Sequence, residues 1–116
     1  MSKCFISTIK KNNFTYVVFY NDWCGYSMKA LKLLNSRNIS YKQCIIDDMD
    51  EIHNINDLTQ KFVEDPTLNY NPNHKTIPFI FKNGVFLGGI RELEKDLGIF
   101  NKHKIIISHD GSIIDP

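Results

Sequence analysis

The chain has 116 residues, a length that fits one domain of the usual roughly 100–150 residues and not two. Apolar residues make up 42% and charged residues 23%, ordinary globular values that exclude a wholly disordered or collagen-like chain. The net charge is only +1 and no apolar run approaches the roughly 18 residues of a membrane helix, so we expect neither a nucleic-acid nor a membrane partner.

The first half of the chain predicts a strand, a helix and a second strand. Residues 3–10 carry apolar side chains spaced like one helical face. Residues 14–20 are rich in β-branched and aromatic side chains and predict a buried strand. An amphipathic helix is expected over 26–37, with Asn38 as a left-handed stop, and a second strand over 40–46.

Acidic residues at 47–51 follow this second strand. Carboxylates favour the positive end of a helix dipole, so the cluster predicts that the next helix begins there and runs to about residue 64. The Asp-Pro pair at 65–66 ends it, because the residue before a proline avoids the helical region. A proline-containing loop is expected over 69–73.

The last third of the chain predicts a hairpin, a short helix and a tail. Segments 77–82 and 85–87 flank an Asn-Gly pair, the strongest short hairpin signal. A short helix is expected over 90–97, and isoleucine runs predict a second hairpin over 104–114. A strand–helix–strand start implies a parallel pair, so we predict an α/β fold: a four-stranded mixed sheet with helices on both faces. The domain covers 1–98 and the tail 99–116.

The three cysteines are too few and too odd in number for a disulfide scaffold, so we expect a reducing, cytoplasmic setting. Cys44 is predicted to be a small core residue and Cys4 to lie on a helix face, although either could pair with Cys24. No metal site is predicted, because the histidines have no ligand spacing and are expected to be solvated: His53, His74, His103 and His109.

Cys24 lies between the first predicted strand and the helix that follows it, among the residues best suited to catalysis. The first N–H groups of a helix lack internal partners, so a thiolate there gains hydrogen bonds and the favourable end of the dipole. The thiolate is the nucleophilic form, which makes Cys24 a candidate catalytic residue. Ser27 faces the same way and could donate to the sulfur. The alternative is an inert cysteine that merely begins a helix.

Three blocks, in order, carry a family resemblance: Trp-Cys-Gly-Tyr-Ser at 23–27, Thr-Ile-Pro at 76–78 and Gly-Gly at 88–89. Together they resemble the glutaredoxin family of the thioredoxin fold, with a monothiol Cys-Gly-Tyr-Ser active site, over about residues 3–98. The resemblance implies a three-layer fold, a cis proline at Pro78 and a glutathione site. The residues that it places against glutathione are Tyr26, Lys75, Thr76, Ile77, Pro78, Gly89, Ile90 and Arg91. For Lys75 an ordinary solvated lysine is an equal alternative.

The chain also departs from the family pattern. Asn21 replaces the usual lysine three residues before the catalytic cysteine, and Asp22 adds a negative charge. Arg91 replaces the usual aspartate after the double glycine, so Glu92 is the candidate ligand for the glutathione amine. These differences bear on affinity for glutathione rather than on the fold.

The resemblance implies a glutathione-dependent thiol–disulfide oxidoreductase that reduces protein–glutathione mixed disulfides at Cys24, working as a monomer on glutathionylated proteins. The alternative is a [2Fe–2S] cluster carrier, in which two chains each supply Cys24 and one glutathione. A third reading is an interaction module of the same fold without turnover.

Overall fold

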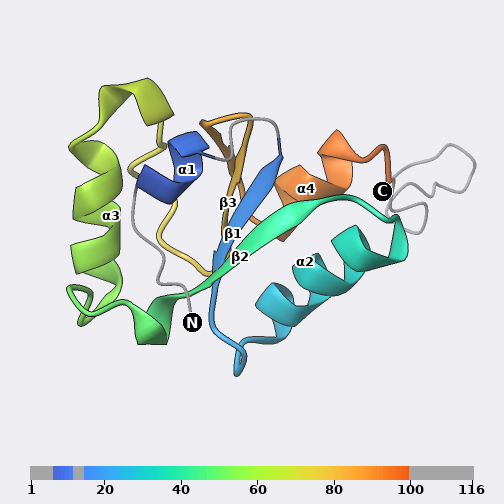
Figure 1. Cartoon of the computed structure of the whole chain (residues 1–116), viewed down its shortest axis with the longest axis horizontal. Coiled ribbons are helices and arrows are strands. Elements are labelled where there is room, and N and C mark those ends of the chain that lie inside the picture. Colours follow the sequence, from blue (N-terminus) through green and yellow to red (C-terminus); the bar gives the residue numbers. More distant parts are fainter. Residues whose placement is uncertain (1–6, 12–14, 100–116) are drawn as a thin grey trace, which may run out of the picture.

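The computed structural model describes residues 7–11 and 15–99 (Figure 1). Cys4, the two histidines beyond residue 100 and the hairpin predicted over 104–114 lie outside these residues. Ten elements follow one another: α1 (Ser7–Lys11), β1 (Tyr16–Tyr20), α2 (Gly25–Ser36), β2 (Tyr41–Ile45), the 3-10 turn η1 (Ile46–Asp48), α3 (Ile55–Val63), the 3-10 turn η2 (Pro66–Leu68), β3 (Phe79–Lys82), β4 (Val85–Gly88) and α4 (Ile90–Asp96).

The four strands form one mixed sheet in the order β2-β1-β3-β4. β1 and β2 are parallel, with Tyr16 opposite Tyr41, as the strand–helix–strand start predicted. β3 runs antiparallel to both β1 and β4. The Asn-Gly pair between β3 and β4 has positive φ at both residues, 55° at Asn83 and 82° at Gly84, which confirms the predicted hairpin turn. The expected α/β fold is therefore confirmed.

Every residue of β1 is buried, because helices cover both faces of the sheet (Figure 1). Val17 and Phe19 point to the side of α1 and α3, where Phe62 is fully buried. Val18 and Tyr20 point to the side of α2 and α4. Because successive side chains of β1 point to opposite faces of the sheet, the strand contributes to both cores. This packing fixes the end of β1, just before the turn that leads to Cys24.

The helix α3 begins later in the chain than the acidic residues at 47–51 predicted. α3 starts at Ile55, and its N-cap is Asn54, whose side chain accepts a hydrogen bond of 2.9 Å from the Asp57 N–H. The residues at 47–51 fall instead in η1 and the connection that follows it. The expectation that the helix begins at this cluster is wrong, because Asn54 caps the first turn of α3 instead.

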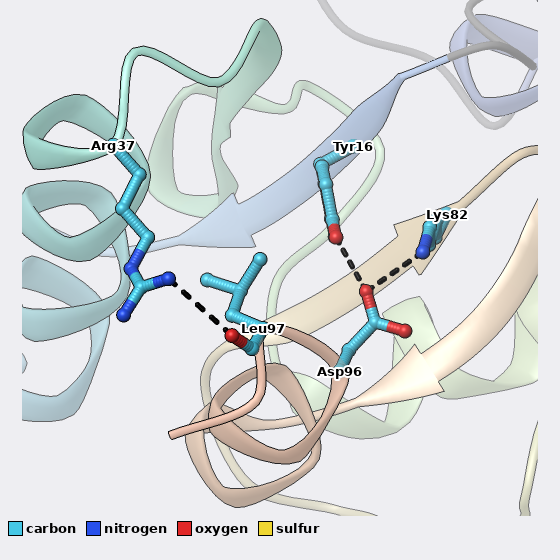
Figure 2. Close-up of polar contacts among 5 residues, drawn as sticks. All are labelled: Tyr16, Arg37, Lys82, Asp96 and Leu97. Atoms are coloured by element: carbon cyan, nitrogen blue, oxygen red, sulfur yellow. Dashed lines mark hydrogen bonds and ion pairs between the residues drawn. The ribbon is translucent and has the colours of Figure 1, made fainter.

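The C-terminal end of α4 is tied to the sheet and to α2 (Figure 2). The Asp96 carboxylate accepts hydrogen bonds from the Tyr16 hydroxyl and from Lys82 Nζ, the latter at 2.8 Å. These donors lower the pKa of Asp96, Lys82 more than Tyr16. Arg37 Nη1, just after α2, donates to the Leu97 carbonyl at 3.3 Å. The far end of α4 is thereby fixed, which sets where its first turn lies.

Among the described residues, no helix has the length and apolar character that crossing a membrane requires.

Candidate active site

Cys24 is the N-cap residue of α2, directly after the turn that leaves β1. Its N–H donates to the Asn21 carbonyl at 3.1 Å, and its own carbonyl accepts from the Met28 N–H at 3.1 Å. The Cys24 side chain makes no capping hydrogen bond and is half-buried. The backbone is therefore held at both ends while the sulfur stays accessible, as a reactive thiol requires.

The Cys24 sulfur lies against the loop before β3. Its Sγ is 3.8 Å from the carbonyl oxygen of Ile77, to which the thiol donates. The peptide bond between Ile77 and Pro78 is cis, as the family resemblance implied. The two segments that carry the resemblance are thus brought together at the sulfur.

A pocket of about 500 Å³ opens beside this contact. All the predicted glutathione contacts except Lys75 line it, together with further residues that sequence reasoning had not placed there, Lys29, His74 and Glu94. Lys75 is exposed and is absent from the pocket wall. The lining residues are Tyr26, Lys29, His74, Thr76, Ile77, Pro78, Gly89, Ile90, Arg91, Glu92 and Glu94.

Charged side chains of both signs stand in this pocket. Lys29 Nζ lies 3.4 Å from Glu94 Oε2, and the Glu92 carboxylate accepts a hydrogen bond of 2.8 Å from the Gly89 N–H. Arg91 is exposed and forms no ion pair within the described part of the chain. Arg91 is therefore a cation available for an anionic group of a ligand.

Gly89 leaves space in the pocket that a side chain would fill. A Cβ added there would lie 3.0 Å from the His74 ring and 3.6 Å from the Pro78 carbonyl oxygen. Contacts of 3.0 Å are shorter than ordinary van der Waals separations between carbon atoms. Any larger residue at this position would push into the ring or into the space where a ligand must lie.

Ser27 is placed differently from what we expected. Its side chain is fully buried, and its hydroxyl has no hydrogen-bond partner. The predicted donation to the Cys24 sulfur is therefore absent. The reason is position: Ser27 lies in the first turn of α2 on the face that packs against the sheet, where apolar neighbours surround it.

Asn21 is a structural link, where the sequence comparison with the family predicted only a lost charge. The residue is buried, with 3% of its surface exposed. Its Oδ1 accepts a hydrogen bond of 3.0 Å from the Asp47 N–H, and its carbonyl holds the Cys24 N–H. The loop that presents Cys24 is thereby tied to the segment after β2.

His74 is the functional residue that sequence reasoning missed. Its Nε2 lies 2.8 Å from the Thr76 carbonyl and 3.2 Å from the Pro78 carbonyl, so the ring bridges the two sides of the cis peptide. The ring packs edge-on against Phe79 and Phe86 and is half-buried. The expectation of a solvated histidine is wrong here; the one available signal was its place two residues before Thr76. His53, by contrast, is exposed.

Cys44 is fully buried in the core under α3, and Cys24 is the free cysteine. The described residues contain no group of three or more metal-binding side chains.

An accessible sulfur at a helix N-terminus, a cis proline beside it and an adjoining pocket with charged side chains are features of a thiol–disulfide oxidoreductase of the thioredoxin-like class. The glutaredoxin family model matches residues 14–87, and the chain belongs to the glutaredoxin family. A probable glutaredoxin of Acanthamoeba polyphaga mimivirus is 37% identical over 86 residues, which span 73% of this chain and 79% of the relative.

Solved structures agree with this assignment. The dithiolic glutaredoxin 2-C-Grx1 of Trypanosoma brucei brucei is 30% identical, with a TM-score of 0.60 over 84% of this chain and 91% of its own. The buckwheat glutaredoxin–glutathione complex has the same fold with a TM-score of 0.60 at 19% identity, over 80% of this chain and 76% of its own.

Proposed function

We propose that this glutaredoxin reduces protein–glutathione mixed disulfides by a monothiol mechanism at Cys24. The observation that carries the proposal is the contact between Cys24 Sγ and the Ile77 carbonyl, at 3.8 Å, beside a pocket of about 500 Å³. That volume lies within the roughly 300–1,000 Å³ of small-molecule sites, and a tripeptide such as glutathione needs a pocket of this size.

The charges of the pocket suit glutathione, which has two carboxylates and one amine. Arg91 and Lys29 supply cations for the carboxylates, and Glu92 and Glu94 supply anions for the amine. The backbone beside the cis proline, at Ile77, is the expected partner for the peptide groups of the glutathione cysteine. The match in charge supports glutathione over an apolar ligand.

The chemistry consists of two exchanges. The Cys24 thiolate attacks the glutathione sulfur of the mixed disulfide, a bond forms between these sulfurs, and the protein leaves as its thiolate. A second glutathione thiolate then attacks the glutathione sulfur bound to Cys24. Oxidised glutathione leaves and the Cys24 thiolate returns, so each cycle converts one mixed disulfide and one free glutathione into one protein thiol and one oxidised glutathione.

Only one protein sulfur is needed for this route. Position 27, where a dithiol enzyme has its second cysteine, is a buried serine. A serine cannot form a disulfide with Cys24, so the intermediate must wait for external glutathione. We therefore expect weak or absent reduction of ordinary protein disulfides.

The test is turnover of a glutathionylated peptide in the presence of glutathione, coupled to glutathione reductase and NADPH. Wild-type protein is expected to turn over and Cys24→Ser to be inactive, while the control Ser36→Ala, an exposed site on the same helix, stays active. An inactive wild type would contradict the proposal and favour an interaction module without turnover.

The cluster-carrier alternative uses the same sulfur. A [2Fe–2S] cluster needs four ligands, and within the described residues no cluster of metal-binding side chains could complete that set. Two chains and two glutathione molecules would have to supply it. Visible absorption after anaerobic purification with glutathione tests this: a coloured dimer would favour the carrier, and a colourless active monomer the enzyme.

A further inference from the structure

A further groove shares Ile77 with the pocket beside Cys24, and its walls include Trp23, Asp47, Ile52, His53, Ile55 and Ile77. We propose that this groove, called here the Trp23 groove, binds a basic peptide segment of the protein substrate beside its glutathionylated cysteine. The proposal rests on the proposed function and names the class of protein on which the enzyme acts.

The Trp23 groove is small and largely apolar. Its volume is about 280 Å³, at the lower end of the roughly 300–1,000 Å³ of small-molecule pockets. Trp23, Ile52, Ile55 and Ile77 give it apolar surface. Such a groove offers room for an apolar side chain that stands next to the modified cysteine of a substrate.

The groove is continuous with the reaction site. Ile77 belongs to the walls of both cavities, and its carbonyl oxygen is the atom that faces the Cys24 sulfur. A glutathionylated protein that reaches Cys24 must lay its own chain on the surface around the sulfur. With glutathione in the larger pocket, the Trp23 groove is a concave surface next to it that a substrate chain can occupy.

The Trp23 side chain is both exposed and ordered, which favours contact with a partner. Its side chain is 68% exposed, yet its Nε1 donates to Asp47 Oδ2 at 3.1 Å, which holds the ring in one orientation. An exposed, ordered tryptophan costs little entropy when a partner covers it, which is why tryptophan is frequent at binding hot spots.

The charge of the surroundings selects the partner. Residues 44–60 carry five carboxylates and no lysine or arginine, in a chain whose net charge is +1. Asp47, Asp48 and Glu51 are exposed, and none of them lies in α3 or caps it. Asp47 lines the groove and Glu51 directly precedes the wall residue Ile52, so this acidic segment attracts lysine and arginine side chains and repels an acidic segment.

Trp23 is the single tryptophan of the chain, so its fluorescence reports occupancy of the groove without any need for turnover. The protein, as Cys24→Ser, is titrated with two peptides that share an apolar core and a serine in place of cysteine, one flanked by lysine and arginine, the other by glutamate. We expect the basic peptide to bind about tenfold more tightly at low ionic strength, because a few surface ion pairs supply that difference. Salt should reduce the preference. Equal affinities would overturn the proposal.

A charge-reversed pair of variants locates the binding. Glu51→Lys, next to the wall residue Ile52, should lower affinity for the basic peptide several-fold and raise it for the acidic one. Glu64→Lys makes the same change in charge at the opposite end of α3 and should leave both affinities as in wild type. A preference that survives Glu51→Lys unchanged would place the basic segment elsewhere and overturn the assignment to this groove.

Turnover separates this proposal from the proposed function. The mixed disulfide of glutathione with 2-mercaptoethanol is too small to reach the Trp23 groove, and Glu51→Lys should reduce it as fast as wild type does. The glutathionylated basic peptide should show a raised KM with this variant. If the small substrate turns over but basic and acidic peptides react alike, the docking proposal is wrong and the enzyme assignment stands. If no substrate turns over but the fluorescence preference is found, the enzyme assignment is wrong and so is the link between the groove and deglutathionylation.

Discussion

The Cys24 sulfur lies 3.8 Å from the carbonyl oxygen of Ile77, a residue 53 positions further along the chain. This contact joins the N-terminus of α2 to the loop that carries the cis proline. Ile77 also lines two cavities, the pocket of about 500 Å³ beside the cis proline and the Trp23 groove. The residues that hold these two segments in place are therefore the ones whose substitution should be most informative.

Ser27→Ala should make the protein more stable. The buried hydroxyl of Ser27 has no hydrogen-bond partner, and a buried unsatisfied group costs about 1–3 kcal/mol. Removing it should raise the free energy of unfolding by about 1 kcal/mol, measured by urea denaturation, with turnover retained. Ser36→Ala is the control, because the Ser36 hydroxyl is exposed and donates to the Leu33 carbonyl. A loss of turnover in Ser27→Ala would mean that the hydroxyl serves the thiolate during the reaction.

Asn21→Lys, which introduces the lysine usual in the family, should destabilise the fold. The change buries an ammonium group at a site that is 3% exposed and leaves the Asp47 N–H without its acceptor. An unpaired buried group of this kind costs about 1–3 kcal/mol. Denaturant unfolding should show that loss, and Asn35→Lys, on the exposed face of α2, should not. Unchanged stability with tighter glutathione binding would contradict the structural role given to Asn21.

His74 should act through the loop that it bridges. His74→Phe keeps an aromatic ring between Phe79 and Phe86 but removes the donor to the Thr76 and Pro78 carbonyls. We expect KM for the glutathionylated peptide to rise about tenfold with kcat little changed, because one net hydrogen bond is worth about 0.5–1.5 kcal/mol.

His74→Gln is the matched comparison, since its amide places an N–H donor near the position of Nε2. It should recover much of the lost affinity. If both variants lose stability alike and KM does not move, His74 is a packing residue and does not position the loop.

Asp96→Asn should lower stability at neutral pH by about 1 kcal/mol, the scale of a partly exposed ion pair with one further hydrogen bond. Lys82, and then Tyr16, lower the pKa of Asp96 in the folded state. A lowered carboxyl pKa stabilises the fold fully above the ordinary value of about 3.9, and the contribution is lost as the pH falls through the folded-state pKa.

The difference in unfolding free energy between wild type and Asp96→Asn should therefore shrink as the pH is lowered from 6 toward about 3. Glu64→Gln, an exposed carboxylate at the end of α3, serves as the control and should show little difference at any pH. A difference that stays constant through this range would mean that the charge of Asp96 contributes nothing to the tie between α4 and the sheet.

Local patterns were enough for much of the fold. The tight turn at 83–84 requires positive φ at both residues, which few pairs other than Asn-Gly adopt. These two residues were therefore enough to predict the hairpin. The left-handed conformation predicted at Asn38 is also present, with φ 57°. The sequence offers two competing signals for the start of α3, the acidic residues at 47–51 and the Asn54 cap. The local pattern does not decide between them, because the stability of a helix depends mainly on packing of its apolar face.

By itself the sequence determined the order of elements, the mixed sheet, and the blocks that carry the family resemblance, since each depends on residues close together in the chain. The tertiary structure decided what Asn21, Ser27 and His74 do. Hydrogen bonds and burial at these sites depend on which remote segments pack together, as for Asn21 and Asp47, 26 positions apart. Such contacts cannot be predicted from hydrophobic periodicity. A single polar side chain leaves the local sequence pattern the same whether its hydrogen-bond partner is water or a buried backbone group.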